Sequence, residues 1–274
     1  MTTTYAEIAA GLRQLGLDRS SDVLVHSSLS SFGYVDGGAE AVCQALVDTC
    51  GTVLMPGWTF DLTGVAVPPG LERPHNAYPP AEDWATFDES VAKATAYRDD
   101  LPVDRWLGRI PDVLRTSFSP LRSSHPLMAF LAVGERAAEV LAAQRHDWPL
   151  GPIEALGGDV LQLGVGHTTN TTIHVAEQHL GRSRFYRYAK VGEGSWAELP
   201  NISGSSEHFD LIEPLLRPAT TEVMIGSCRA RRIPIAAVLE ATRQLVLDDP
   251  AALLCTEDHD TRCAAAIEQR LQQL

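Results

Sequence analysis

The sequence predicts an α/β protein with a central mixed sheet flanked by helices and an acidic, loop-rich insertion that forms a substrate cleft. Residues 22–26 and 52–55 are short apolar runs with β-branched side chains, separated by a helix-like segment over 39–50. A strand, a helix and a second strand in this order favour a parallel pair inside a layered sheet. Residues 57–104 interrupt the pattern, because they are rich in proline, glycine and acidic residues.

The other elements follow from hydrophobic periodicity. An amphipathic helix is expected over 5–17, before the first strand. Further helices are expected over 110–115, 134–143, 171–180 and 234–247, and from about residue 257. Further strands are expected over 127–133, 160–164 and 222–225, with an antiparallel hairpin of 185–190 and 195–199. We treat residues 1–274 as one domain, with 57–104 as an insertion within it.

Composition and charge narrow the classes of function. The chain has 274 residues and a formal net charge of −13, which repels nucleic-acid phosphates and attracts polycations. An acidic surface that only keeps the protein soluble is an equal alternative. No run approaches the ~18 apolar residues of a membrane span, and the first residues lack the pattern of a signal peptide. Five scattered cysteines suggest reduced thiols. We expect a cytoplasmic protein that binds neither nucleic acid nor membrane.

Two histidine-containing patterns could suggest a metal. His174 and His179 are five residues apart, which puts them on different faces of a helix and does not match the metalloprotease motif. Cys255, His259 and Cys263 are spaced by four, so one helical face could present all three to zinc, with a fourth ligand from elsewhere. A buried Cys255 beside a surface His259 is the plainer alternative. We expect that no metal is required.

The most informative segment is 161–177, which runs from a strand through a glycine turn into a helix. His174 lies in the first turn of that helix, and Glu177 follows three residues later, so the two side chains are neighbours. A carboxylate beside an imidazole orients the ring and raises its basicity, as a general base requires. Spacing alone also allows a polar surface pair. Glu207 and His208 form a second acid–imidazole pair, which by itself indicates a helix start.

Four blocks of this sequence, in the same order, resemble the aminoglycoside 3-N-acetyltransferases. They are Val25-His-Ser-Ser-Leu29 with the glycines that follow, Met55-Pro-x-Trp58-Thr59, Arg122-Ser-x-His125-Pro126, and Gly164-Val-Gly-His-x-x-Asn170-Thr-Thr-x-His174-x-x-Glu177. The resemblance covers nearly the whole chain. It implies an enzyme that moves the acetyl group of acetyl-coenzyme A to the 3-amino group of the deoxystreptamine ring of an aminoglycoside, which gives antibiotic resistance.

The resemblance also implies roles for single residues. The catalytic histidine of the family falls on His174, and a carboxylate that orients the reacting amine or the histidine falls on Glu207. Glu177 is the alternative support for the imidazole. Candidates for contact with the aminoglycoside are Asp61, Asp83 and His208. We expect direct transfer in a ternary complex, because no cysteine lies in a motif typical of an activated nucleophile.

Acetyl-coenzyme A needs donors for its phosphates and pantetheine arm. The loop over 27–38 follows a strand and opens a helix, where backbone N–H groups gather. Candidate contacts are Ser27, Ser31, Gly33, Arg122, Ser123 and His125. A same-fold acetyltransferase that acts on another amine and a noncatalytic ligand-binding relative stay open, as does the oligomeric state, a homodimer included.

Overall fold

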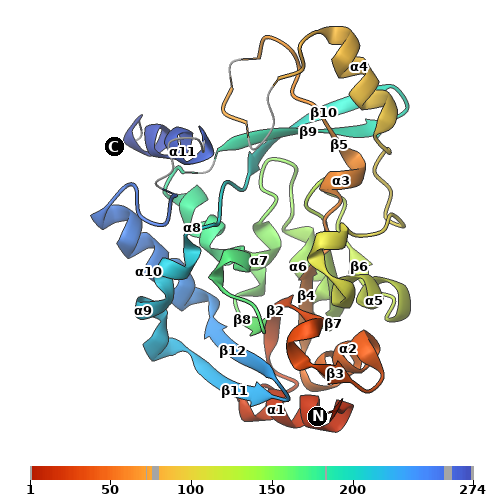
Figure 1. Cartoon of the computed structure of the whole chain (residues 1–274), viewed down its shortest axis with the longest axis vertical. Coiled ribbons are helices and arrows are strands. Elements are labelled where there is room, and N and C mark those ends of the chain that lie inside the picture. The colour runs from red at the N-terminus through yellow and green to blue at the C-terminus, as the bar shows by residue number, and fades with distance from the viewer. Residues whose placement is uncertain (1, 72, 76–79, 183, 256–260, 273–274) are drawn as a thin grey trace.

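The computed structural model describes residues 2–71, 73–75, 80–182, 184–255 and 261–272. A seven-stranded mixed sheet in the order β11-β12-β8-β2-β4-β7-β6 runs through the lower two thirds of the molecule (Figure 1). Its strands are β2 Asp22–Ser27, β4 Thr52–Pro56, β6 Leu121–Arg122, β7 Phe130–Gly134, β8 Asp159–Leu163, β11 Thr221–Ile225 and β12 Cys228–Pro234. The central strands β8, β2 and β4 are parallel, and the outer strands pair antiparallel.

Helices cover both faces of this sheet, which confirms the predicted architecture. One face packs against α1 Tyr5–Gln14, α2 Gly38–Thr49 and α5 Arg109–Ser117. The other packs against α6 Ala137–Ala142, α7 Gly151–Leu156, α8 Thr172–His179 and α10 Ile235–Asp248. Side chains of a strand alternate between the faces. Val23 and Val25 therefore enter the first apolar cluster, while Leu24 enters the second. The parallel pairing of the two strands first predicted is also observed.

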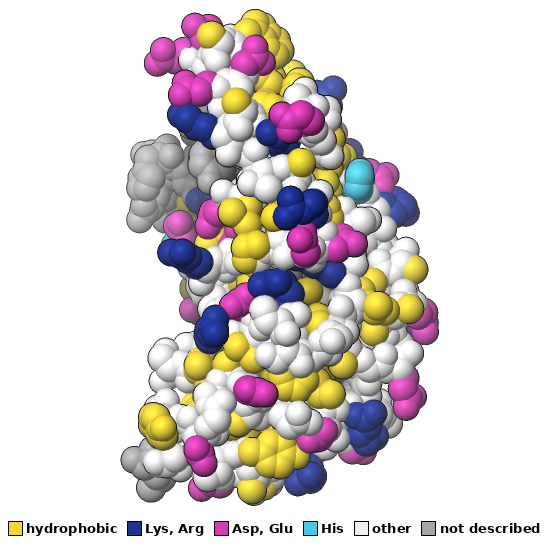
Figure 2. All heavy atoms as spheres, turned by 90° about the vertical axis from the view of Figure 1, so that its right-hand side faces the viewer, with side chains coloured by type: hydrophobic (Ala, Val, Ile, Leu, Met, Phe, Trp, Pro, Cys, Tyr) yellow, Lys and Arg dark blue, Asp and Glu magenta, His cyan; other side chains and the backbone are white. Residues whose placement is uncertain are grey.

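The insertion over 57–104 holds more regular structure than predicted. It contains α3 Phe60–Thr63, β5 Gly64–Val65 and α4 Trp84–Lys93, and β5 extends the hairpin of β9 Phe185–Gly192 and β10 Ser195–Ile202 into a second sheet. The carboxylate of Asp83 accepts from the Thr86 N–H at the start of α4, which buries Phe87 and Val91. This lobe forms the upper end of the molecule (Figure 1), and acidic side chains gather there (Figure 2).

The remaining elements are short or terminal. They are β1 Thr2–Thr3, β3 Tyr34–Val35, α9 Glu213–Leu216, α11 Thr261–Gln272 and the 3-10 turns Leu29–Phe32, Arg105–Leu107, His167–Thr169, Phe209–Ile212 and Arg217–Ala219. None of the helices in the described part of the chain is both long and apolar enough to cross a bilayer.

The predicted start of one helix was wrong, and a long strand of the central sheet was missed. The helix expected from Gly134 begins at Ala137, because Gly134 ends β7 with a φ of 121° and packs against the Gly51 carbonyl. Strand β12 was not predicted at all, since arginines interrupt its apolar pattern. The guanidinium groups of Arg231 and Arg232 pair with acidic side chains, which makes an arginine-rich strand possible inside the sheet.

Candidate active site

A cavity of about 790 Å³ lies at the carboxyl ends of the three central parallel strands. Residues within 25–30, 56–61 and 165–174, which are the ends of β2 and β4 and the segment that follows β8, form much of its wall. Since β2 has β4 on one side and β8 on the other, the loops that leave these strands diverge here. Such a switch point is where open α/β sheets bind ligands.

His174 and Glu177 meet in this wall as the sequence predicted. Both are on α8, and His174 Nδ1 lies 2.7 Å from Glu177 Oε2. His174 is 5% exposed and lines the cavity, while Glu177 behind it is 1% exposed. The ring of Phe209 packs on the imidazole with centroids 4.7 Å apart. With the carboxylate bound at Nδ1, the other ring nitrogen is the one left for a ligand.

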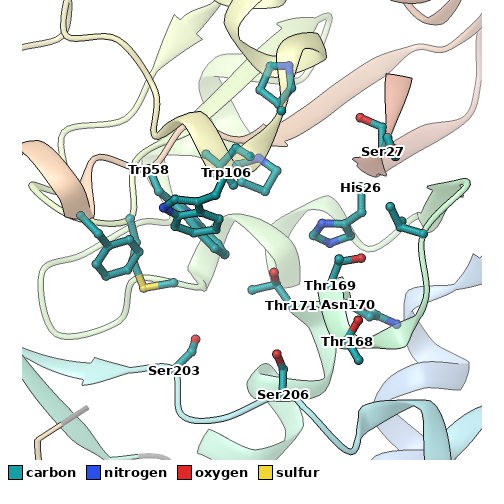
Figure 3. A pocket seen from close by; sticks show the side chains of 18 of the residues that line it. His26, Ser27, Trp58, Trp106, Thr168, Thr169, Asn170, Thr171, Ser203 and Ser206 are labelled. Atoms are coloured by element: carbon teal, nitrogen blue, oxygen red, sulfur yellow. The ribbon is translucent and has the colours of Figure 1, made fainter. Parts of the chain in front are cut away.

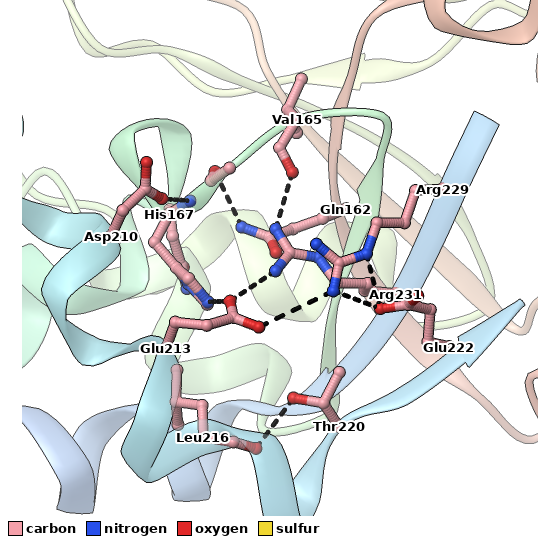
Figure 4. Close-up of polar contacts among 12 residues, drawn as sticks. Gln162, Val165, His167, Asp210, Glu213, Leu216, Thr220, Glu222, Arg229 and Arg231 are labelled. Carbon is pink, nitrogen blue, oxygen red and sulfur yellow. Dashed lines mark hydrogen bonds and ion pairs between the residues drawn. The ribbon is translucent and has the colours of Figure 1, made fainter. Parts of the chain in front are cut away.

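The glycine turn before α8 is held from behind by a polar network (Figure 4). The carboxylate of Asp210 accepts from the His167 N–H at 2.6 Å, and Glu213 binds both the His167 ring and the Arg231 guanidinium. Arg231 also donates to the Val165 carbonyl. Burial and the neighbouring Arg231 lower the pKa of His167. These contacts fix the backbone that lines the cavity from Val165 to His174.

Aromatic side chains form the opposite wall (Figure 3). The rings of Trp58 and Trp106 lie 5.5 Å apart, and the Arg187 guanidinium lies 4.6 Å above the ring of Phe60. Asp61, the acid expected to contact an aminoglycoside, lines the cavity beside them. The turn that carries it, α3, is capped by a second acid outside the cavity wall, Asp104, which accepts from two of its backbone N–H groups. Burial raises the pKa of Asp104 to about 6.

Three buried polar atoms at the cavity have no hydrogen-bond partner among the residues that the structure describes. They are His26 Nε2, Trp58 Nε1 and Ser203 Oγ, which belong to residues that line the cavity. Burial lowers the pKa of His26 to about 4, so this imidazole is neutral and can donate or accept one hydrogen bond. Because unsatisfied buried polar groups are costly, these atoms are suited to bind a ligand. None of the three was predicted as a ligand contact from the sequence.

The loop predicted to cradle the cofactor lies only partly in the wall. Ser27 lines the cavity with its neighbours Ser28 and Ser30. Ser31 and Gly33 are not among the lining residues. The Ser31 hydroxyl instead donates to the Ser28 carbonyl at 2.7 Å and packs against Gly164, where an added Cβ would lie 1.9 Å from the Ser31 oxygen.

Arg122, Ser123 and His125 lie outside the cavity and have a structural role instead. Both Nη atoms of Arg122 donate to backbone carbonyls, those of Gly57, Asp99 and Leu101, and so are used within the protein. The Ser123 hydroxyl accepts from the Phe130 N–H. His125 Nδ1 accepts from the N–H groups of Leu127 and Met128, and burial lowers the pKa of His125 to about 3. Ser123 and His125 thus hold a local turn, while Arg122 joins that turn to two distant segments of the chain.

The remaining predicted contacts divide between the edge of the cavity and the surface. Glu207 is exposed and follows Ser206, which lines the cavity. Its carboxylate lies 3.8 Å from the guanidinium of Arg262, another lining residue. His208 is half-buried next to it. Asp83 is not among the residues that line the cavity, and its carboxylate caps α4. Of the two predicted carboxylates, the structure therefore brings Glu177 and not Glu207 to His174.

Two of the three candidate zinc ligands lie within the described residues. Cys255 and Cys263 are buried, with their sulfur atoms 2.7 Å apart. His259 lies outside the described residues. Within the described ranges, no group of three or more histidine, cysteine, aspartate or glutamate side chains is arranged to hold a metal ion.

An imidazole–carboxylate pair at the wall of a large cavity in a three-layer α/β fold is an arrangement that suits general acid–base chemistry. The sequence model of a family described as aminoglycoside 3-N-acetyltransferase matches residues 24–246, most of the chain. The chain belongs to this family, as its motifs predicted.

Individual relatives share both sequence and fold. The chain is 32% identical over 220 residues to the SPbeta prophage-derived aminoglycoside N(3')-acetyltransferase-like protein YokD of Bacillus subtilis, covering 75% of this chain and 78% of that protein. The crystal structure of YokD matches with a TM-score of 0.79 at 27% identity, over 92% of this chain and 96% of YokD.

Two further relatives bear on the activity. Aminoglycoside N(3)-acetyltransferase IX of Micromonospora chalcea is 30% identical over 253 residues, which are 84% of this chain and 85% of that enzyme. The structure of AAC-IIIb as a binary complex with CoASH matches with a TM-score of 0.71 at 25% identity, over 90% of this chain and 97% of AAC-IIIb.

Proposed function

We propose that this protein uses acetyl-coenzyme A to acetylate an amino group of an aminoglycoside, the 3-amino group of the deoxystreptamine ring. The observation that carries the proposal is the His174–Glu177 pair, 2.7 Å across, at the wall of the cavity. Membership of the family and the name of the Micromonospora chalcea relative support the same activity.

The chemistry assigned to the pair is removal of a proton. An aminoglycoside amine is largely protonated at neutral pH, so it must lose a proton before its nitrogen can attack a carbonyl carbon. His174 takes that proton at Nε2, and Glu177 stabilises the imidazolium through a charge-assisted hydrogen bond at Nδ1. Glu207 remains a proposed contact for the acceptor amine, from the edge of the cavity.

Acetyl-coenzyme A would supply the thioester that the amine attacks. The wall offers it the Ser27–Ser30 loop and the unsatisfied polar atoms of His26, Trp58 and Ser203. A developing oxyanion requires donors of this kind in a site that excludes water. The complex of AAC-IIIb with CoASH supports a coenzyme A site in this fold. Direct transfer within a ternary complex remains the proposed order, because all five cysteines are buried and burial raises the pKa of Cys43, Cys50 and Cys228.

The proposal is tested by replacing His174 with alanine. We expect turnover, measured as thiol release from acetyl-coenzyme A, to fall at least 100-fold, as is typical for loss of a general base. Coenzyme A binding, measured by calorimetry, should change by less than threefold. The matched control is His179→Ala, which removes an exposed imidazole from the same helix that also pairs with a glutamate at 2.7 Å. Turnover of His174→Ala within tenfold of the parent would remove His174 from the role of base.

A second candidate, acetylation of a less cationic amine, is favoured by the charge of the cavity wall. Its described residues include Arg109, Arg187 and Arg262 but a single carboxylate, Asp61. A polycationic aminoglycoside is better matched by several acids. Thiol release should therefore be compared for gentamicin-, kanamycin- and apramycin-type acceptors and for monoamines that carry a carboxylate or phosphate. Turnover of only the monoamines that carry a carboxylate or phosphate would establish the second candidate. No turnover of any amine would favour a noncatalytic relative.

A further inference from the structure

A fully buried arginine stands directly behind the His174–Glu177 pair. Arg182 follows α8 and is 0% exposed. Its Nη2 atom lies 3.1 Å from Glu177 Oε1, while Glu177 Oε2 binds His174 Nδ1. One carboxylate thus joins the imidazole at the cavity wall to a guanidinium in the interior.

The same guanidinium is fixed on its other side by the backbone. Arg182 Nη1 donates to the carbonyls of Pro250 and Ala252 at 3.0 Å each, and Nη2 donates to the Ala252 carbonyl at 2.6 Å. The backbone N–H of Arg182 also donates to the Glu177 carbonyl at 2.7 Å. A planar guanidinium can serve such a set of acceptors at once, whereas the ammonium group of a lysine acts as a point charge.

We propose that Arg182 is a positioning residue for the acetyl transfer: it holds the Glu177 carboxylate ionised and oriented, and so sets the basicity of His174. The proposal rests on the proposed role of His174 as the base. A carboxylate that is almost fully buried favours its protonated form unless a cation compensates its charge. A neutral carboxyl group would stabilise the imidazolium much less than a carboxylate does.

The positive charge of Arg182 also determines in which direction the pH dependence of the activity moves when this residue is replaced. A cation disfavours the uptake of a proton by groups near it, so loss of Arg182 favours protonation of the His174–Glu177 pair as a whole. A proton on either member removes the active arrangement, in which a neutral imidazole faces an ionised carboxylate. The base must be unprotonated to act, and the acid limb of the pH profile therefore moves to higher pH when the cation is lost. At an effective dielectric constant of about 20, loss of a unit charge one carboxylate away from the base moves this limb by about one pH unit.

Other charged groups near α8 are less able to produce this effect. Glu154 of α7 pairs with His179 at the exposed end of the helix. The charged residues of α10, the helix packed against α8, are exposed to solvent: Glu240, Arg243 and Asp248, as is Asp249, which follows the helix. Phe209 covers the imidazole with an apolar ring, and beyond it Glu207 is exposed near Arg262.

The experiment compares pH profiles of kcat/KM for three variants with the parent enzyme. Arg182→Gln should move the acid limb upward by about one unit, so activity on that limb falls about tenfold and recovers as the pH rises. Arg182→Lys keeps the positive charge and should restore the limb to within about 0.3 unit of the parent. The matched control is Arg136→Gln, because Arg136 also bridges a carboxylate and two carbonyls, Asp22 with Ala155 and Leu156, but far from α8 in the chain. It should lose stability without moving the limb.

A purely structural role predicts a different result: Arg182→Gln would lower kcat by the same factor at every pH, or the limb would move equally in the Arg136 control. Either outcome overturns the proposal. A readout independent of turnover is the NMR titration of the His174 ring in histidine-labelled protein, assigned with His174→Gln. If no amine is acetylated, the proposed function fails, yet an upward shift of this titration in Arg182→Gln would still show that Arg182 controls the imidazole, and an unchanged titration would refute it.

Discussion

Glutamine at position 177 would separate the charge of the carboxylate from its shape. The side chain keeps its size and an oxygen that can accept from His174 Nδ1, which lies 2.7 Å away, but it loses the negative charge that faces the imidazolium. A hydrogen bond that involves a charged group contributes about 1.5–3 kcal/mol. If this stabilisation exists only once the base is protonated, kcat falls about 10- to 150-fold, since about 1.4 kcal/mol changes the rate tenfold. The acceptor KM should change less than threefold.

The variant also leaves the buried guanidinium of Arg182 without its carboxylate, which costs about 3–5 kcal/mol of stability. Urea unfolding must therefore be measured in parallel, and rates compared only where both proteins are more than 95% folded. The matched control is Glu154→Gln, which breaks a glutamate–histidine pair of the same length near the other end of the helix. A fully folded Glu177→Gln enzyme that keeps kcat within threefold of the parent would refute the assignment of Glu177 as the support of the base.

Three further outcomes are expected. His125→Asn keeps a side-chain acceptor for the turn but removes a group whose pKa is about 3 in the folded protein, below the unfolded value near 6.5. The parent therefore loses stability as the pH falls below about 6.5, and the variant should be spared about 2 kcal/mol of that loss at pH 5. Urea unfolding measures this, and an identical pH dependence of the two proteins would contradict the assignment. Gly164→Ala should lower the free energy of unfolding by about 2–5 kcal/mol, because φ is +70° and the new Cβ would meet the Ser31 side chain. Adding Ser31→Gly should recover part of this loss, and no recovery would show that the clash is not its cause. Phe87→Ala should cost about 3–5 kcal/mol in the insertion lobe, with faster hydrogen exchange of α4 than of α8, and equal exchange would contradict a separate apolar cluster there.

The sequence predicted the central layer well because that layer depends on local pattern. The buried runs at 22–26, 52–55 and 160–164 are apolar on both faces, which is typical of parallel strands between two layers of helices. The adjacent positions of His174 and Glu177 on one helix also follow from spacing, since residues three apart are neighbours.

Other parts of the site depend on contacts that no local pattern contains. Arg122 occurs in a block with serine and histidine, yet its guanidinium is used by carbonyls from two distant segments of the chain. Strand β12 is polar in sequence and is stable because distant acids pair with its arginines. Arg182 was overlooked for a similar reason, since its partners at 250–252 follow a helix some seventy residues later.

If Arg182 positions Glu177 as proposed, its hydrogen bonds to residues 250–252 give the C-terminal region a part in the chemistry. The family match ends at residue 246, before Pro250 and Ala252, whose carbonyls hold the guanidinium. A chain trimmed to the shared boundary would keep both members of the His174–Glu177 pair and lose the anchor behind them. Under the role proposed for Arg182, two backbone carbonyls near the C-terminal end of the described chain therefore help to hold the carboxylate behind the base.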